Sequence, residues 1–169
     1  MKSITAEQTD SLLKMAHIKE APVDVHKIAQ QLGFTIIEAD FPENYSGEIF
    51  IEGKVKSIGI NKNHTSKRQR FSIAHELGHY LNAHEYFDEN GTSLEEKDFD
   101  YHNPIHRQEH EANMFASSLL MPKEFLIKDL DTLGLDIAKL TEKYQVSEQA
   151  LWVRLTTLKL LHKYTPKQS

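Results

Sequence analysis

The spacing of hydrophobic residues changes twice along this chain, and that change constrains the fold more than any other feature. Two segments with helical spacing come first, at residues 6–17 and 22–33. Three short segments rich in β-branched and aromatic residues, which is typical of strands, follow at 34–37, 48–51 and 55–60. From residue 66 the helical spacing returns, apart from a polar loop at about 88–104. This order indicates an α+β fold.

The strand segments predict a small sheet within one domain. Gly53 and Lys54 separate the second and third strand segments, so we expect a hairpin and a small antiparallel sheet. The chain has 169 residues, without an internal repeat or a Pro/Gly-rich linker, which favours a single domain over residues 1–169. Its expected parts are N-terminal helices (1–33), the sheet (34–61), two central helices (66–122) and a C-terminal helical segment (123–169).

Composition excludes several classes of protein. There is no Cys, so disulfides, thiolate metal sites and cysteine nucleophiles are ruled out. The net charge of −5 argues against a dedicated nucleic-acid-binding protein. Neither an apolar run long enough to span a membrane nor the apolar core of a signal peptide is present, so we expect a cytoplasmic protein. The 10 His residues are many for this length and direct attention to metal binding.

Residues 75–79 read His-Glu-Leu-Gly-His, with two histidines four positions apart. On an α-helix, His75 and His79 lie on one face, about 6 Å apart along the axis, and can bind one Zn²⁺. Glu76 would then lie beside the metal, where it can accept a proton from water. The alternative is a surface helix whose His and Glu side chains are merely solvated.

The helix that carries this motif has a predicted start and a buried side. Ser66 and Gln69 predict a capping box at its N-terminus. The apolar residues at helical spacing are Phe71, Ala74, Leu77, Gly78 and Leu81. The motif residues fall on an adjacent face, as the chemistry requires, and this favours a site over a solvated helix.

A catalytic zinc site uses three protein ligands and one open position. A second helical segment with an apolar face begins near Glu109 and ends at Pro122. Glu109 and Asn113 lie one turn apart on it, so one can bind the metal while the other supports the site. Glu111 points about 200° away from Glu109 and cannot share that role. In the alternative interpretation, these acidic residues only stabilise a helix N-terminus through the helix dipole.

Two motifs together resemble the ImmA/IrrE family of zinc metallopeptidases. The first is Arg-Phe-Ser-Ile-Ala-His-Glu-Leu-Gly-His at 70–79, and the second is Glu-x-x-Ala-Asn-x-Phe-Ala, followed by Leu-Leu-Met-Pro, from residue 109. The resemblance extends over roughly residues 20–162 and implies a gluzincin-like fold, with the sheet packed on a zincin-like helical core. It implies Glu109 as the third ligand, with Glu111 as the other reading, and a supporting role for Asn113 beside a ligand histidine.

The resemblance also implies an activity and a partner. One Zn²⁺ per chain would be held by His75, His79 and Glu109, and Glu76 would act as the general base of a site-specific endopeptidase. The implied substrate is a phage-like helix-turn-helix transcriptional repressor, so the protein would be an antirepressor for mobile-element or stress-response genes. The alternatives are a regulator that binds a repressor or DNA without cleavage and a purely structural zinc site. The intact Glu76 speaks against both.

Other histidines and cations have plainer interpretations. His102, His106 and His110 are four residues apart and would suit a second metal stripe, but Pro104 interrupts a helix there, so we expect a loop near the cleft. Tyr101, His102 and His106 are the candidates for stabilising the developing oxyanion. The basic cluster (Lys62, Lys67, Arg68 and Arg70) is expected to be a solvated face, with contact to an acidic substrate as the alternative.

The C-terminal segment resembles a helix-turn-helix. Residues 137–151 carry the pattern, with Ser147 as the N-cap of the second helix. The second helix offers mostly apolar residues, including Trp152, that we expect in the core, and few cations. We therefore expect a helical wall or a docking surface for a protein substrate rather than a DNA-binding element.

Overall fold

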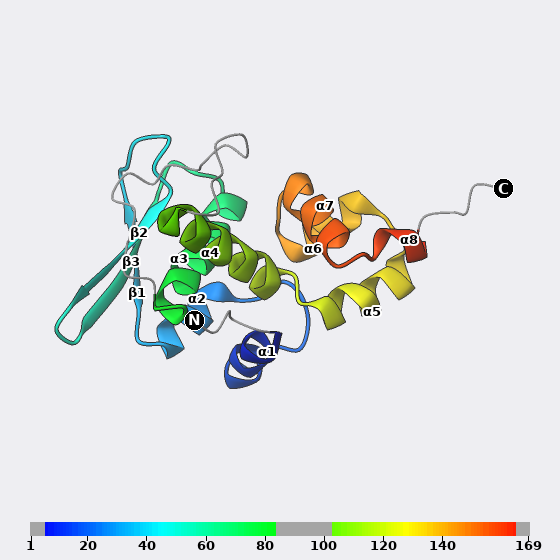
Figure 1. Cartoon of the computed structure of the whole chain (residues 1–169), viewed down its shortest axis with the longest axis horizontal. Helices are drawn as coiled ribbons and strands as arrows, with labels where there is room; N and C mark the ends of the chain where they lie inside the picture. Colours follow the sequence, from blue (N-terminus) through cyan, green and yellow to red (C-terminus); the bar gives the residue numbers. More distant parts are fainter. Residues whose placement is uncertain (1–5, 84–102, 165–169) are drawn as a thin grey trace.

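The computed structural model describes residues 6–83 and 103–164 and confirms the α+β fold. Its elements are α1 (Ala6–Met15), α2 (Val25–Gln31), β1 (Thr35–Ala39), β2 (Gly47–Glu52), β3 (Val55–Asn61), α3 (Ser66–Leu81), α4 (Pro104–Leu120), α5 (Lys123–Leu133), α6 (Ile137–Tyr144), α7 (Glu148–Thr157) and α8 (Leu161–Tyr164). Figure 1 shows the sheet at one end of the molecule, α3 and α4 side by side in the middle, and α5 to α8 at the other end.

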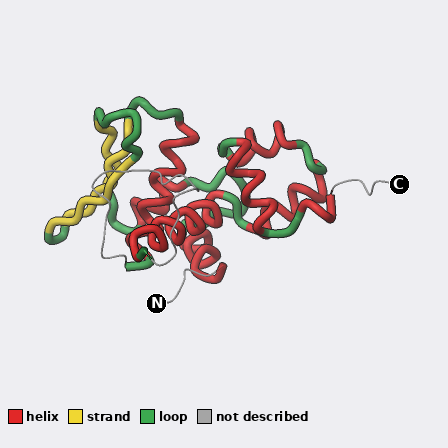
Figure 2. The backbone as a smooth tube through the Cα atoms, turned by 45° about the horizontal axis from the view of Figure 1, so that its top comes forward, coloured by secondary structure: helices red, strands yellow, loops and turns green. Residues whose placement is uncertain are grey.

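The sheet is mixed, not wholly antiparallel as expected. β2 and β3 form the predicted antiparallel hairpin, but β1 pairs in parallel with β3, and the strand order is β1-β3-β2. Residues 40–46 carry the chain from the end of β1 past the end of β3 to the far edge. β2 then runs back along β3, which places β3 in the centre and leaves β2 at an edge. Figure 2 shows the hairpin extending away from the helices.

The inner face of the sheet packs against α3, and this contact fixes the helix that carries the metal-binding motif. Ile58 and Ile60 on β3 are buried, and so are Ile73 and Leu77 on α3. Burying such side chains stabilises a fold by about 1.5–3 kcal/mol each, so the orientation of α3 about its axis is strongly determined.

The predicted capping box at the start of α3 is displaced by one residue. Thr65, rather than Ser66, is the N-cap, and its hydroxyl accepts a hydrogen bond from the Arg68 backbone N–H at 3.3 Å. The Gln69 side chain does not close a box but donates to the carbonyl oxygen of Asn61 at 3.0 Å. Both hydroxyl residues suit a cap, and the structure selects the earlier one.

The prediction of a loop around His106 and His110 is wrong. Both residues lie on α4, because Pro104 is the first residue of that helix rather than an interruption of it. Proline suits the first helical position, where its missing N–H has no intrahelical partner to lose. Asn103 caps the helix by accepting a hydrogen bond from the Ile105 backbone N–H at 3.0 Å. The rest of the expected polar loop, up to residue 102, lies outside the described residues.

α6 and α7 form the helix-turn-helix that the sequence predicts. Ser147 is the N-cap of α7, and its hydroxyl accepts from the Ala150 backbone N–H at 3.1 Å. The expectation for Trp152 is wrong, because 38% of this residue is exposed. The α7 face that packs into the core is formed by the fully buried Leu151 and Leu155.

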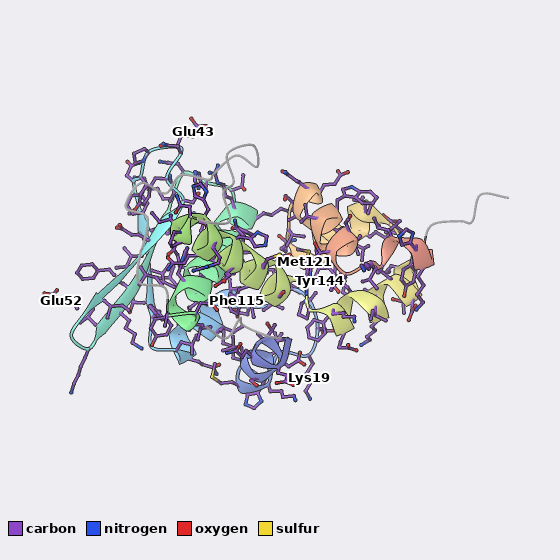
Figure 3. All side chains as sticks on the ribbon, viewed as in Figure 1. Lys19, Glu43, Glu52, Phe115, Met121 and Tyr144 are labelled. Atoms are coloured by element: carbon purple, nitrogen blue, oxygen red, sulfur yellow. The ribbon has the colours of Figure 1, made fainter. Side chains whose placement is uncertain are left out.

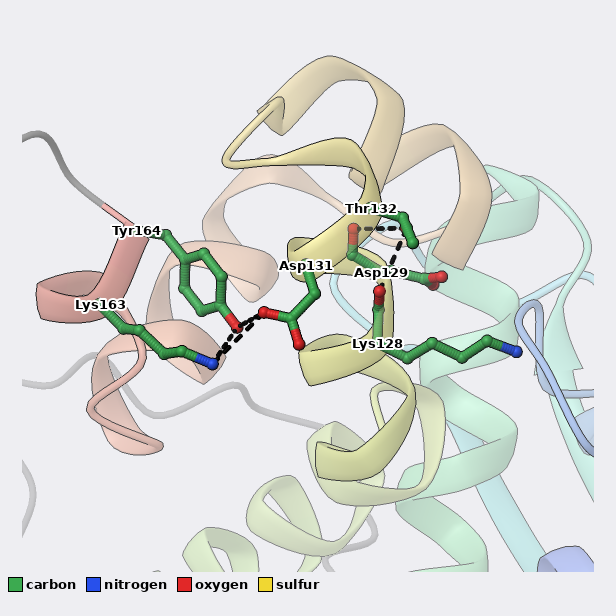
Figure 4. A network of polar contacts seen from close by, with 6 residues as sticks. All are labelled: Lys128, Asp129, Asp131, Thr132, Lys163 and Tyr164. Atoms are coloured by element: carbon green, nitrogen blue, oxygen red, sulfur yellow. Dashed lines mark hydrogen bonds and ion pairs between the residues drawn. The ribbon is translucent and has the colours of Figure 1, made fainter.

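Polar contacts hold the C-terminal helices together. Asp129 on α5 accepts hydrogen bonds from Lys143 Nζ at 2.6 Å and from the Tyr144 hydroxyl at 2.8 Å. Figure 4 shows a second set two residues further along α5, in which the Asp131 carboxylate accepts hydrogen bonds from Lys163 Nζ and the Tyr164 hydroxyl on α8. Across the described ranges, 6–83 and 103–164, no helix is both long and apolar enough to cross a membrane.

Candidate metal centre

One face of α3 carries the three polar residues of the motif. His79 and Glu76 are almost completely buried, with 3% and 8% of the residue exposed. The side chain of His75 is 16% exposed. Burying a polar group costs free energy, so such groups are normally buried only where hydrogen-bond partners satisfy them or where they have a functional role. The opposite side of α3 is anchored in the core, so the polar face is turned toward α4.

α4 brings Glu109 to the two histidines. Its Oε1 lies 3.0 Å from His79 Nε2, and its Oε2 lies 3.3 Å from His75 Nε2. The two imidazole Nε2 atoms are 2.9 Å apart. These three residues form the one group of potential metal ligands found within the described part of the chain, with donor atoms all within 4.8 Å of one another. Glu111 is not a member of this group.

The close approach of α3 and α4 depends on Gly78, inside the motif. A Cβ at this position would lie 3.0 Å from Ala112 Cα and 3.0 Å from Phe115 Cδ1. Any side chain here would therefore push α4, and Glu109 with it, away from the histidines. The sequence did contain a signal for this close approach, because a glycine within a helical pattern often marks close packing.

The donor set fits a zinc ion. Ligands at about 2.0–2.2 Å in a tetrahedron lie about 3.3–3.6 Å from one another, whereas the three separations here are 2.9, 3.0 and 3.3 Å, so the donors need to move apart by only a few tenths of an ångström to hold the ion. Two imidazole nitrogens and one carboxylate are ligands that zinc prefers. Asn113 Oδ1 accepts a hydrogen bond from His75 Nδ1 at 2.9 Å. This contact leaves the lone pair of His75 Nε2 directed at the centre of the group, as metal binding requires.

The charges of the site perturb its pKa values. Burial lowers the pKa of His75, but its hydrogen bond with Glu109 and the charges of Glu76 and Glu109 outweigh burial, and the pKa lies above its ordinary value. Burial raises the pKa of Glu76, although both histidines act in the opposite direction. Burial would raise the pKa of Glu109 too, yet hydrogen bonds with His75 and His79 lower it to about 2. Glu109 is therefore an anion across the physiological range.

Glu76 lies between the donor group and the edge strand β2. A Cβ built on Gly47, the first residue of β2, would be 3.8 Å from Glu76 Oε1 and 3.6 Å from Ser72 Cβ. Within the described part of the chain, no hydrogen bond engages the Glu76 carboxylate. A buried, uncommitted carboxylate with a raised pKa, beside a potential metal site, is suited to proton transfer. The spacing of hydrophobic residues in the sequence does not predict that the start of β2 lies beside Glu76.

The remaining sequence candidates are only partly placed. Tyr101 and His102 lie outside the described residues, and His106 lies on α4 one turn before Glu109. Asn113 lies on α4, with its Oδ1 2.9 Å from His75 Nδ1.

Comparisons with known proteins bear on this site. Residues 29–156 match the family model Peptidase_M78, described as an IrrE N-terminal-like domain. No curated protein matches the chain. A solved structure described as a Mycobacterium tuberculosis transcriptional regulator is similar, with a TM-score of 0.69 and 16% sequence identity. The match covers 96% of this chain and 48% of that one, so this chain spans about half the length of that protein. At this identity the likeness concerns the fold.

Proposed function

This chain belongs to the Peptidase_M78 family, with an IrrE N-terminal-like domain, and on that premise we propose that it is a zinc-dependent endopeptidase. Its proposed substrate is a helix-turn-helix transcriptional repressor in the cytoplasm, and cleavage would release the mobile-element or stress-response genes under that repressor. The observation that carries the proposal is the meeting of two histidines, Glu109 and the uncommitted carboxylate of Glu76 at the start of an edge strand.

Three side chains would hold the metal. His75, His79 and Glu109 supply the donors, and Asn113 keeps the His75 ring in the binding tautomer. A Zn²⁺ ion in this position would polarise the scissile carbonyl and lower the pKa of a water molecule toward 7. Because the pKa of Glu109 is about 2, its carboxylate needs no deprotonation to act as a ligand near neutral pH.

Glu76 would move the proton. Its carboxylate accepts a proton from the attacking water and delivers it to the nitrogen of the leaving amine. Burial raises its pKa toward the working pH, where a carboxyl group can both accept and release a proton efficiently.

The edge strand would hold the substrate. β2 is paired on one side by β3, and no described strand pairs with its other side. An extended peptide can add to such an edge through main-chain hydrogen bonds. Because β2 begins beside Glu76, a peptide on this edge would pass the donor group.

The test compares Glu76→Gln with Glu111→Gln, which makes the same chemical change outside the donor group. The assay substrate is a helix-turn-helix repressor, chosen from the genes beside this one where such a gene is found. Gln keeps the size of Glu76 but cannot accept the proton, so cleavage should fall by about 10²–10⁴-fold. Zinc content and repressor binding should persist. Glu111→Gln should cleave as the unsubstituted protein does.

The outcome in cells separates cleavage from binding. If the proposal is correct, Glu76→Gln abolishes derepression and the repressor accumulates uncut. Full derepression by Glu76→Gln without cleavage would contradict the peptidase and establish the non-cleaving regulator in its place.

A further inference from the structure

A hollow of about 460 Å³ lies between residues 40–46 and the beginning of α3. We call it the α3 hollow. Its lining residues are Phe41, Glu43, Asn63, His64, Thr65 and Arg68. It contains none of the candidate metal ligands, so it is separate from the donor group, although both use the same helix.

The walls of the α3 hollow are fixed. The side-chain nitrogen of the buried Asn61 lies 2.9 Å from the carbonyl oxygen of Pro42 and 2.8 Å from that of Tyr45, which ties residues 40–46 to the end of β3. The ring of Phe41 packs on that of Tyr45, with centroids 4.8 Å apart. His64 Nε2 donates to the carbonyl oxygen of Glu43 at 2.8 Å. These contacts order the walls of the hollow without a ligand, so binding there would cost little rearrangement of the protein.

Arg68 is the cation of this hollow, and its charge is not neutralised. Its Nη2 donates to the Ser46 hydroxyl at 3.2 Å. Among the described residues, no carboxylate lies within ion-pair distance of it. The side chain of Glu43 lies at the outer edge of the loop, at the top of Figure 3, and points away from the body of the protein.

The other three residues of the basic cluster do not offer an unpaired charge to the hollow. Lys62 pairs with Asp40 at 3.0 Å, so its charge already has a partner. Arg70 donates to the carbonyl oxygen of Val23 at 2.9 Å and points into the protein. Lys67 does not line the hollow. An apolar wall from Phe41 and a guanidinium without an ion-pair partner among the described residues suit a short aliphatic side chain that ends in a carboxylate.

The hollow is aligned with the donor group along α3. Arg68, Ser72 and Glu76 are spaced by four residues and lie on one face of the helix, about 12 Å from first to last along its axis. The same order appears opposite them, where Ser46 contacts Arg68, and Gly47 faces Ser72 and Glu76. An extended peptide advances about 3.4 Å per residue, so 12 Å corresponds to three or four residues.

We propose that the α3 hollow is a specificity subsite that binds an Asp or Glu side chain of the substrate, three or four residues from the scissile bond. The inference rests on the proposed function, since it takes the substrate to lie along β2 past Glu76. Arg68 makes the recognising contact. For Arg68, this favours contact with an acidic substrate, the alternative that the sequence left beside a solvated face for the basic cluster.

The test is a selection of binding peptides that does not depend on cleavage. A random peptide library is selected on the zinc-loaded Glu76→Gln protein, and on the same protein carrying Arg68→Glu or Arg68→Met. Lys67→Glu is the matched control, because it makes the same charge change on the neighbouring residue. We expect Asp and Glu to be enriched at one position in the parent and in Lys67→Glu. A charged hydrogen bond is worth about 1.5–3 kcal/mol, so the enrichment should be about 10–100-fold.

The two Arg68 variants should respond differently. Arg68→Met should lose the acidic preference, and Arg68→Glu should replace it with a preference for Lys and Arg. The proposal is overturned if no peptides are selected, if acidic residues are not enriched, or if Arg68→Glu keeps the same enrichment as Lys67→Glu. Cleavage of the selected peptides by the unsubstituted protein is measured separately, and its absence would count against the peptidase and not against the hollow.

Discussion

Gly78→Ala should weaken metal binding more than it weakens the fold. The added Cβ would lie 3.0 Å from Ala112 Cα and 3.1 Å from the Ala112 carbonyl oxygen, both of which are backbone atoms of α4. Ordinary contacts are about 3.5–4.0 Å, so α4 must move by roughly 0.5–1 Å. Overpacking costs about 1–3 kcal/mol, whereas the better helix propensity of Ala returns about 1 kcal/mol. The net loss of stability should be about 0–2 kcal/mol.

The same displacement acts directly on the donor group. Glu109 is carried by α4 and lies 3.0 and 3.3 Å from the two histidines. Metal–ligand distances tolerate only about 0.2 Å, so a shift of this size should reduce zinc affinity by about 10–100-fold, as disturbing a ligand's support does. Zinc affinity is measured by competition with a chromogenic chelator, and stability by urea unfolding of the metal-free protein.

Gly134→Ala is the control for lost stability alone. Gly134 has φ +67°, which L residues rarely adopt, and nothing lies within 4 Å of a Cβ built there. The substitution should cost about 1–3 kcal/mol through backbone strain and leave the donor group unmoved. If Gly78→Ala lowers zinc affinity no more than Gly134→Ala does, then the α3–α4 approach does not set the geometry of the donor group.

Three further outcomes are expected. Glu109→Ala should lose zinc during dialysis and Glu111→Ala should retain it, and the reverse result would show that the wrong face of α4 has been assigned. In the metal-free protein, the lowered pKa of Glu109 contributes stability above pH 4.5, and this contribution is lost as the pH falls toward 2. Glu109→Gln should therefore lower the free energy of unfolding by ~3 kcal/mol at pH 5–6, as measured by urea unfolding. This difference between the two proteins should shrink steadily below pH 4.5. Salt-dependent submicromolar binding to duplex DNA should be absent in a fluorescence anisotropy titration, and its presence would assign DNA contact to α6 and α7.

Local sequence patterns predicted the elements well because their determinants are local. The strand segments and the hairpin follow from β-branched residues around Gly53, and Ser147 caps α7 where a hydroxyl precedes an apolar helix. The errors also have local causes. Pro104 can end a helix or begin one, and only the chain that follows decides which. Trp152 has a large apolar side chain but lies on the solvent-exposed side of α7.

What the sequence could not provide is the meeting of distant segments. The parallel pairing of β1 with β3 depends on residues 40–46 crossing the end of β3, which no periodicity encodes. Helix geometry places His75 and His79 on one face, but the approach of Glu109 depends on how tightly α4 packs at Gly78. The position of β2 beside Glu76, and the hollow at Arg68, likewise exist only once the sheet is laid against α3.

The measurement that tests the metal centre most directly is the zinc content and zinc X-ray absorption spectrum of the purified protein. We expect about one zinc per chain, with four nitrogen or oxygen neighbours at about 2.0–2.2 Å, two of them imidazoles, and loss of the metal in His79→Ala. Equal zinc content in His79→Ala, or a spectrum without two imidazoles, would contradict the site formed by His75, His79 and Glu109.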